Sequence, residues 1–310
     1  MSVVDSQTGA VALPGIDGGS LPGFLAALGV LRLLAATTSD GDVRLSWRWT
    51  GRWSPHLVGM GVGDRDEIAE RLVVGLRRDA GALKRLGEDD SLLLQDRFEN
   101  AVDSLQHPFA PGTTDHHAAR WSAALASEAC PKVGKSPPSV DHTPLKALGG
   151  GKQRFIPTLI ALFEDVRVEQ VDRSLTEPWT HEDAAPTLRL DPVDDRRHAH
   201  RWLAPMLDRP TSEAGGNALA AAALPLFVSV PTDRGLRTSG FTRRDGTFVT
   251  WPIWSPAFDL PTITTLLELE ELQRSVPDRR GLSLLGIEEI LRSERIVVDK
   301  YVNFTPAWSP

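Results

Sequence analysis

The stretch Ser20-Leu-Pro-Gly-Phe-Leu-Ala-Ala-Leu-Gly-Val-Leu-Arg-Leu-Leu-Ala-Ala36 decides how the fold begins. Ser20 is a favourable N-cap, and Pro22 stands in the first turn, where its missing N–H would have no helical partner. Apolar residues then recur at helical spacing, namely Phe24, Leu25, Leu28, Leu31 and Leu34. Because they cover more than one face, this stretch predicts a helix that is buried on most sides.

Outward from this helix, the first half of the chain is expected to be mainly helical. Residues 37–42 supply a turn, and residues 43–50 alternate apolar and polar side chains in the manner of a half-buried strand. Residues 64–100 are charged and leucine-rich at helical spacing, which predicts two helices with a break near 87–90. A third helix is expected at 114–129.

Prolines and glycines interrupt the chain at 131–151, so no long regular element is expected there. Five basic residues and one acid, Asp141, lie between Lys132 and Arg154, which makes this the most basic stretch of the chain. We therefore expect three parts, a helical lobe at 1–130, a basic connector at 131–151 and an α+β lobe at 152–310.

The second half is expected to mix helices and strands. Helices are expected at 155–164, 194–203, 213–224, 261–274 and 282–292. Strands are expected at 166–171, 187–190, 226–230 and 296–302. The turn Arg244-Asp245-Gly246 between 236–241 and 247–251 predicts a β-hairpin, because Asp-Gly suits the turns that join paired strands. The expected fold class is thus α+β, with a short sheet in the helical first half.

Composition limits the function. The 310 residues include 34 basic and 41 acidic side chains, a formal net charge of −7, which is the wrong sign for gripping nucleic acid over the whole surface. The chain has one cysteine, Cys130, and so no intramolecular disulfide, which suits a reducing compartment. The longest apolar run is shorter than the ~20 residues of a membrane span, so we expect a soluble, cytoplasmic protein.

Two histidine clusters invite a metal interpretation. Adjacent side chains such as His116 and His117 diverge on a helix, and helix capping by Asp115 explains that segment more simply. The pair His198 and His200, with His181 and Asp183 nearby in sequence, also falls in a segment expected to be helical. No motif of an established catalytic site occurs, so we expect neither catalysis nor a cofactor.

The strongest candidate sites are basic residues that would contact nucleic acid. On and beside the connector they are Lys132, Lys135, Lys146, Lys152 and Arg154, and near the expected hairpin they are Arg237, Arg243 and Arg244. A solvated linker and a solvated turn are the alternatives. The nine tryptophans favour core packing or subunit docking over stacking on bases.

Several short blocks resemble subunits of type I-G (formerly I-U) CRISPR effector complexes. The first are Gly23-Phe-Leu-Ala-Ala-Leu-Gly-Val-Leu-Arg32 and Leu45-Ser-Trp-Arg-Trp49, and a loop-then-helix block follows at 143–155. The later ones are Leu188-Arg-Leu-Asp-Pro192, Asp195-Arg-Arg197, Asn217-Ala-Leu-Ala220, Leu224-Pro-Leu-Phe227, Gly240-Phe241 and Thr250-Trp-Pro-Ile-Trp254. These blocks are scattered over most of the chain, and none is a catalytic signature.

The resemblance implies a large-subunit-like component of an RNA-guided surveillance (Cascade) complex. Such a subunit contacts the short motif that flanks the target, helps to open double-stranded DNA and presents it to a separate helicase-nuclease. Its partners would be a guide-RNA-containing particle and target DNA, with no membrane. Two alternatives remain open, a metal-dependent hydrolase or nuclease that uses the histidine clusters, and a scaffold that binds proteins through tryptophan-rich faces.

Overall fold

The computed structural model describes residues 4–5, 10–37, 43–59, 65–105, 115–132, 134–148, 154–194, 211–298 and 301–310. Helices and strands both contribute, and the strands form several small sheets. The expected α+β fold class is therefore confirmed, and the described part of the first half has more residues in helices than in strands. Within the described part of the chain, no helix is long and apolar enough to cross a membrane.

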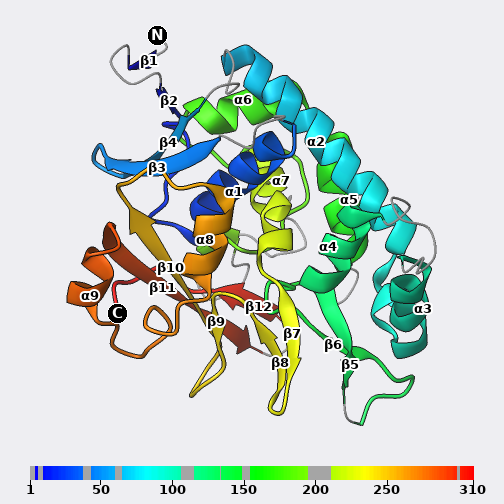
Figure 1. Ribbon diagram of the computed structural model, residues 1–310. Coiled ribbons are helices and arrows are strands. Elements are labelled where there is room, and N and C mark those ends of the chain that lie inside the picture. Colours follow the sequence, from blue (N-terminus) through cyan, green and yellow to red (C-terminus); the bar gives the residue numbers. More distant parts are fainter. Residues whose placement is uncertain are drawn as a thin grey trace, which may run out of the picture.

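Helix α1 (Leu21–Ala35) lies at the centre of the fold, as its sequence predicts (Figure 1). The Ser20 hydroxyl accepts a hydrogen bond from the Gly23 N–H at 3.2 Å, so the expected cap is present. Helix α7 (Ala214–Ala222) packs directly against α1. A Cβ atom at Gly29 would overlap the carbonyl oxygen of Leu219, so glycine is needed for this close approach of the two backbones.

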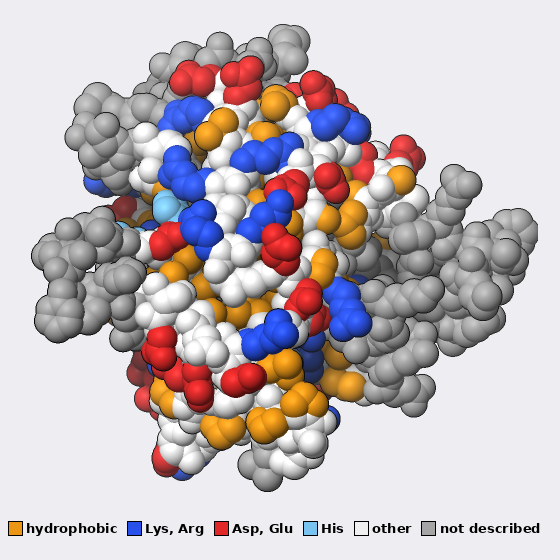
Figure 2. All heavy atoms as spheres, turned by 90° about the vertical axis from the view of Figure 1, so that its right-hand side faces the viewer, with side chains coloured by type: hydrophobic (Ala, Val, Ile, Leu, Met, Phe, Trp, Pro, Cys, Tyr) orange, Lys and Arg blue, Asp and Glu red, His pale blue; other side chains and the backbone are white. Residues whose placement is uncertain are grey.

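Further helices surround this central pair. They are α2 (Arg65–Leu86), α3 (Gln95–Leu105), α4 (His116–Leu125), α5 (Phe155–Asp165) and α6 (Val168–Thr176). The 3-10 helix η1 (Asp90–Leu93) stands between α2 and α3, which confirms the expected break. On the face that α2 presents, basic and acidic side chains are interspersed (Figure 2).

The strands form two antiparallel sheets and two separate pairs. The first sheet contains β1 (Val4–Asp5), β2 (Ala10–Ala12), β4 (Trp53–Val58) and β3 (Arg44–Trp49), in that order. The second contains β12 (Tyr301–Phe304), β11 (Ile287–Val298), β10 (Phe248–Trp254) and β9 (Phe241–Thr242). The pairs are β5 (Ala126–Pro131) with β6 (Val140–His142) and β7 (Ser229–Thr232) with β8 (Gly235–Thr238). The remaining short helices are η2 (Pro192–Asp194), η4 (Leu224–Leu226), α8 (Leu260–Leu267) and α9 (Arg279–Ser283).

Four aromatic rings connect α1 to both sheets. Phe24 of α1 stacks on Trp47 of β3 and on Trp251 of β10, with ring centroids 6.1 and 5.8 Å apart. Trp254 meets Phe24 and Trp47 edge-on. The indole N–H groups of Trp251 and Trp254 donate to the carbonyl oxygens of Gly18 and Leu45. Core packing is thus the role of these three tryptophans.

A buried ion pair holds α1 to its other neighbours. The Arg32 guanidinium binds the carboxylate of Asp79 on α2 and donates to the carbonyl of Ala222 on α7. Trp121 of α4 donates its indole N–H to the other oxygen of Asp79 at 3.2 Å. Both oxygens of Asp79 and two guanidinium nitrogens of Arg32 therefore have hydrogen-bond partners, which buried charges require.

The predicted lobes 1–130 and 152–310 share one hydrophobic core, which extends from Leu13 to Phe304. The division of the chain at 131–151 stays a prediction.

Several expected elements are wrong in type. Residues 166–171 are not a strand, because α6 begins at Val168 and buries Val171 and Leu175 at helical spacing. Residues 187–190 also form no strand, and Arg189 has φ +58°, which interrupts an extended backbone.

Two expected helices end early and one is a strand. Helix α4 stops at Leu125, where the chain enters β5, and α8 stops at Leu267. Residues 287–292 of the helix expected at 282–292 belong to β11, since pairing with β10 overrides the local pattern. Residues 195–210, which carry most of the helix expected at 194–203, lie outside the described residues.

The aromatic cluster provides a test of the core. Trp251→Ala should lower the free energy of unfolding by about 3 to 5 kcal/mol, because it opens a cavity beneath α1 and leaves the Gly18 carbonyl without its donor. Urea denaturation measures this loss. The control Trp49→Ala, in which the removed side chain is 64% exposed, should cost below about 1 kcal/mol. Equal losses in the two variants would contradict the assignment.

Candidate nucleic-acid interface

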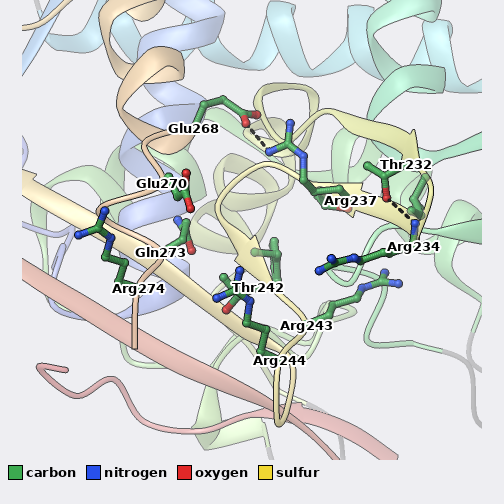
Figure 3. Close-up of a pocket in the computed structure, with 13 residues that line it drawn as sticks. Thr232, Arg234, Arg237, Thr242, Arg243, Arg244, Glu268, Glu270, Gln273 and Arg274 are labelled. Atoms are coloured by element: carbon green, nitrogen blue, oxygen red, sulfur yellow. Dashed lines mark hydrogen bonds and ion pairs between the residues drawn. The ribbon is translucent and has the colours of Figure 1, made fainter. Parts of the chain in front are cut away.

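Two β-hairpins and a turn segment enclose a pocket among the described residues. The hairpins are β7–β8 and β9–β10, and the segment is 268–274, which follows α8 (Figure 3). The pocket has a volume of about 560 Å³. The chain passes from β8 to β9 through Gly240, whose φ of +73° is a conformation that favours glycine.

The expected hairpin exists, but its first strand is shorter than predicted. Residues 235–238 form β8 and pair with β7, so only Phe241 and Thr242 pair with β10. The expected turn Arg244-Asp245-Gly246 joins β9 to β10, with positive φ at its Asp245 and Gly246. The arginines therefore divide between two hairpins, with Arg237 on β8 and Arg243 and Arg244 after β9.

We call this cavity the arginine-lined pocket. Its charged lining residues are Arg234, Arg237, Arg243, Arg244, Arg274, Glu268 and Glu270. Leu236 and Phe241 are buried side chains that contribute an apolar part of the lining. The pocket therefore combines an excess of guanidinium groups with an apolar surface.

Three of the five arginines are paired. Arg237 binds Glu268 at 2.6 Å, and Arg274 lies 3.6 Å from Glu271. Arg243 binds Asp141 at 3.0 Å. The side chains of the other two, in the β7–β8 turn and the β9–β10 turn, make no hydrogen bond or ion pair with the described residues; they are Arg234 and Arg244.

Asp141 joins the connector to the pocket. Its carboxylate on β6 receives Arg243 from the β9–β10 turn and lies 3.9 Å from the ammonium of Lys132. Arg295 of β11 also binds the connector, because its guanidinium donates hydrogen bonds to the carbonyl oxygens of Pro144 and Lys146. The fold therefore brings two basic clusters about a hundred residues apart in sequence onto one surface.

The charges in this surface act on one another. Burial lowers the pKa of the Lys132 ammonium, Asp141 opposes that shift, and the positive charges of Lys146, Lys135 and Arg243 add to it. For Asp141, burial acts to raise the pKa, but the hydrogen bond and charge of Arg243, the His142 N–H and the charge of Lys132 together keep the pKa below its usual value. Three cations and one opposing carboxylate, Asp141, thus act on Lys132.

His142 is neutral beside these cations. Burial, followed by the charges of Lys132 and Lys146, lowers the pKa of its imidazole to about 3. Its Nε2 lies 2.8 Å from the Lys132 ammonium, and its Nδ1 lies 3.3 Å from the Thr143 carbonyl oxygen. A neutral ring with the proton on Nδ1 satisfies both contacts, since the ammonium can only donate.

The remaining connector residues differ in role. Lys135 is exposed. Lys146 donates to the Leu148 carbonyl at 2.8 Å, and its ammonium lies 6.0 Å from the centre of the Phe155 ring, so this lysine packs locally. Arg154 is exposed at the start of α5, where its charge acts on Asp89, away from the pocket. Lys152 lies outside the described residues.

The first histidine cluster is structural in its surroundings. His116 and His117 begin α4, and the Asp115 carboxylate accepts from the Ala118 N–H at 3.1 Å, which confirms the expected cap. Burial and the charge of Arg78 lower the pKa of His117, which favours its neutral form.

The second cluster does not assemble a metal site in the described part of the chain. Asp183 pairs with Arg173 at 2.6 Å and accepts from the Ala214 N–H, so its oxygens hold α6 to α7. Nowhere among residues 4–5, 10–37, 43–59, 65–105, 115–132, 134–148, 154–194, 211–298 and 301–310 do three His, Cys, Asp or Glu side chains gather as metal ligands would. His198 and His200 lie outside these ranges.

Sequence reasoning missed part of this surface. Asp141 had a readable signal, because it is the only acid in the basic stretch. Arg274 has no such signal, since the local pattern predicts a helix that extends to it, whereas α8 ends at Leu267.

A scan against models of known protein families and a search of curated proteins both find no match to the chain.

The neutral imidazole predicts a pH dependence of stability. Between about pH 6.5 and pH 4 the unfolded chain takes up a proton at His142 that the folded chain does not, so the free energy of unfolding falls as the pH falls. His142→Gln removes this titration and keeps an oxygen that accepts from Lys132. As the pH falls, the free energy of unfolding of this variant, measured by urea denaturation at each pH, should decrease less than that of the wild type. The difference should reach at most about 1.4 kcal/mol per pH unit. The same pH dependence of the free energy of unfolding in both proteins would contradict a neutral, buried His142.

Proposed function

We propose that the chain is a non-catalytic subunit of an RNA-guided CRISPR antiviral effector complex. In this role it helps to recognise and open target double-stranded DNA and presents the DNA to a separate helicase-nuclease. The observation that carries the proposal is that Asp141 joins the connector to the β9–β10 turn, which lines one pocket with the β7–β8 hairpin. The sequence resemblance to type I-G subunits supplies the biological context.

The charge distribution supports action inside an assembly. The whole chain has a formal net charge of −7, so long-range attraction alone would not bring it to DNA. A local cluster of arginine and lysine side chains still neutralises phosphates at short range and releases counterions. Most of the affinity for a long target then comes from the particle, and this surface adds local contacts that set where the strand lies against it.

Some basic residues of this surface are available to contact DNA, and others are bound to protein groups. Arg234, Arg244 and Lys135 are exposed and are the groups available to phosphate oxygens. Lys132 and Lys146 have protein partners, so they contribute mainly positive potential and local packing.

A protein-binding scaffold is a second candidate, favoured by exposed apolar side chains. Leu284 is 86% exposed beside α9, and Val276 is 79% exposed on the preceding loop. Trp49 stands at the exposed end of β3, where its ring meets that of Trp53. Exposed apolar residues of this size are typical of surfaces that other proteins cover.

Isolation of the tagged protein from its own cells tests the proposal. We expect it to bring down a uniform short RNA and a set of repeated subunits, because the proposed affinity resides in the assembly. Size-exclusion chromatography followed by RNA sequencing measures this. RNase digestion before capture is the control, since it separates RNA-dependent association from direct protein contacts. A protein that never joins an RNA-containing particle would exclude the effector-complex function and favour the scaffold.

A further inference from the structure

Two guanidinium groups of the arginine-lined pocket are available to a ligand. Arg234 lies in the turn between β7 and β8, and Arg244 lies in the turn between β9 and β10. Neither side chain makes a hydrogen bond or ion pair with the residues that the structure describes. Figure 3 shows both pointing into the pocket from different hairpins. Guanidinium is a planar donor that matches the oxygens of a phosphate.

A carboxylate faces these arginines from the other wall. Glu270 stands in the turn segment after α8, and Figure 3 places it across the pocket from Arg234. Its carboxylate makes no hydrogen bond or ion pair with the described residues, whereas that of Glu268 binds Arg237 and Ser239. An ionised carboxylate only accepts hydrogen bonds, so this wall calls for N–H or O–H donors on the ligand.

The volume and the apolar lining of the pocket suit one nucleotide. Its volume of about 560 Å³ lies within the ~300–1,000 Å³ of pockets that hold small organic ligands. Leu236 and Phe241 give an apolar surface on which a flat ring can lie. A base within a duplex is stacked and paired, so only a nucleotide that has left the stack can enter.

These three features define the ligand. It carries an anion at one end, a flat ring in the middle and N–H donors at the other end. Among the bases, guanine alone offers two adjacent N–H donors on its pairing edge, which match the two oxygens of a carboxylate. We propose that the pocket holds one unpaired guanine nucleotide of a nucleic-acid strand, with its phosphate on Arg234 and Arg244 and its base edge on Glu270. The inference rests on the proposed function, because it names the ligand of the same surface.

Short single-stranded DNA probes test this assignment on the full chain. Fluorescence anisotropy compares labelled TTGTT with TTATT, TTCTT and TTTTT. We expect TTGTT to bind about tenfold more tightly than the others, as one carboxylate that accepts two N–H donors from a base allows. Equal affinity for all four strands, or no binding to any, would overturn the proposal.

Three variants separate the two ends of the ligand. Arg234→Ala and Arg244→Ala should each weaken all four strands by a similar factor, because they remove phosphate contacts. Glu270→Ala should abolish the preference for TTGTT and leave the weaker binding to the other strands unchanged. The control Arg280→Ala, at an exposed arginine of α9, should change neither quantity. Equal losses in Arg280→Ala and Arg234→Ala would overturn the assignment of the phosphate to the pocket.

Free guanosine monophosphate distinguishes a strand from a soluble nucleotide. If it competes as well as unlabelled TTGTT, the pocket serves a free nucleotide and the strand assignment is overturned.

Failure of the pocket inference can be distinguished from failure of the proposed function. An RNA-containing particle whose isolated subunit ignores TTGTT would refute only the pocket inference, whereas binding of TTGTT without any particle would refute only the effector-complex function.

Discussion

The burial of α1 on all sides is the constraint on which the rest of the fold depends. Gly29 brings the backbone of α1 against α7, and Phe24 places a ring beneath Trp251 of β10. Helix α7 leads through η4 into the β7–β8 hairpin, and β10 is the strand on which β9 pairs. Both hairpins of the arginine-lined pocket are therefore positioned by one buried helix.

Electrostatics then decides how the basic surface is organised. Lys135, Lys146 and Arg243 all act on Lys132, and cations at close range repel one another unless an acid lies among them. Asp141 meets that need for Lys132 and Arg243, while His142 stays neutral and accepts from Lys132. Because these pairings lie on the connector side, Arg234 and Arg244 of the two turns keep their donors for a ligand.

The sequence predicts local features well and long-range ones poorly. The α1 helix, its Ser20 cap and the Asp115 cap follow from residue chemistry within one turn. The helix predicted at 282–292 is wrong because strand pairing, a long-range effect, overrides the helical pattern of these residues. The basic residues were identified from local charge, but their meeting at Asp141 depends on a contact across 102 positions, which no local pattern encodes.

The salt dependence of target binding by the assembled particle tests the central claim most directly. Each lysine or arginine that contacts a phosphate steepens the fall of affinity with salt by about one unit of log–log slope. If the connector and the hairpins form one nucleic-acid surface, a particle that carries Lys135→Ala together with Arg244→Ala should show a slope shallower by about two units. An unchanged slope, with the particle intact, would contradict the claim and remove this surface from the interface.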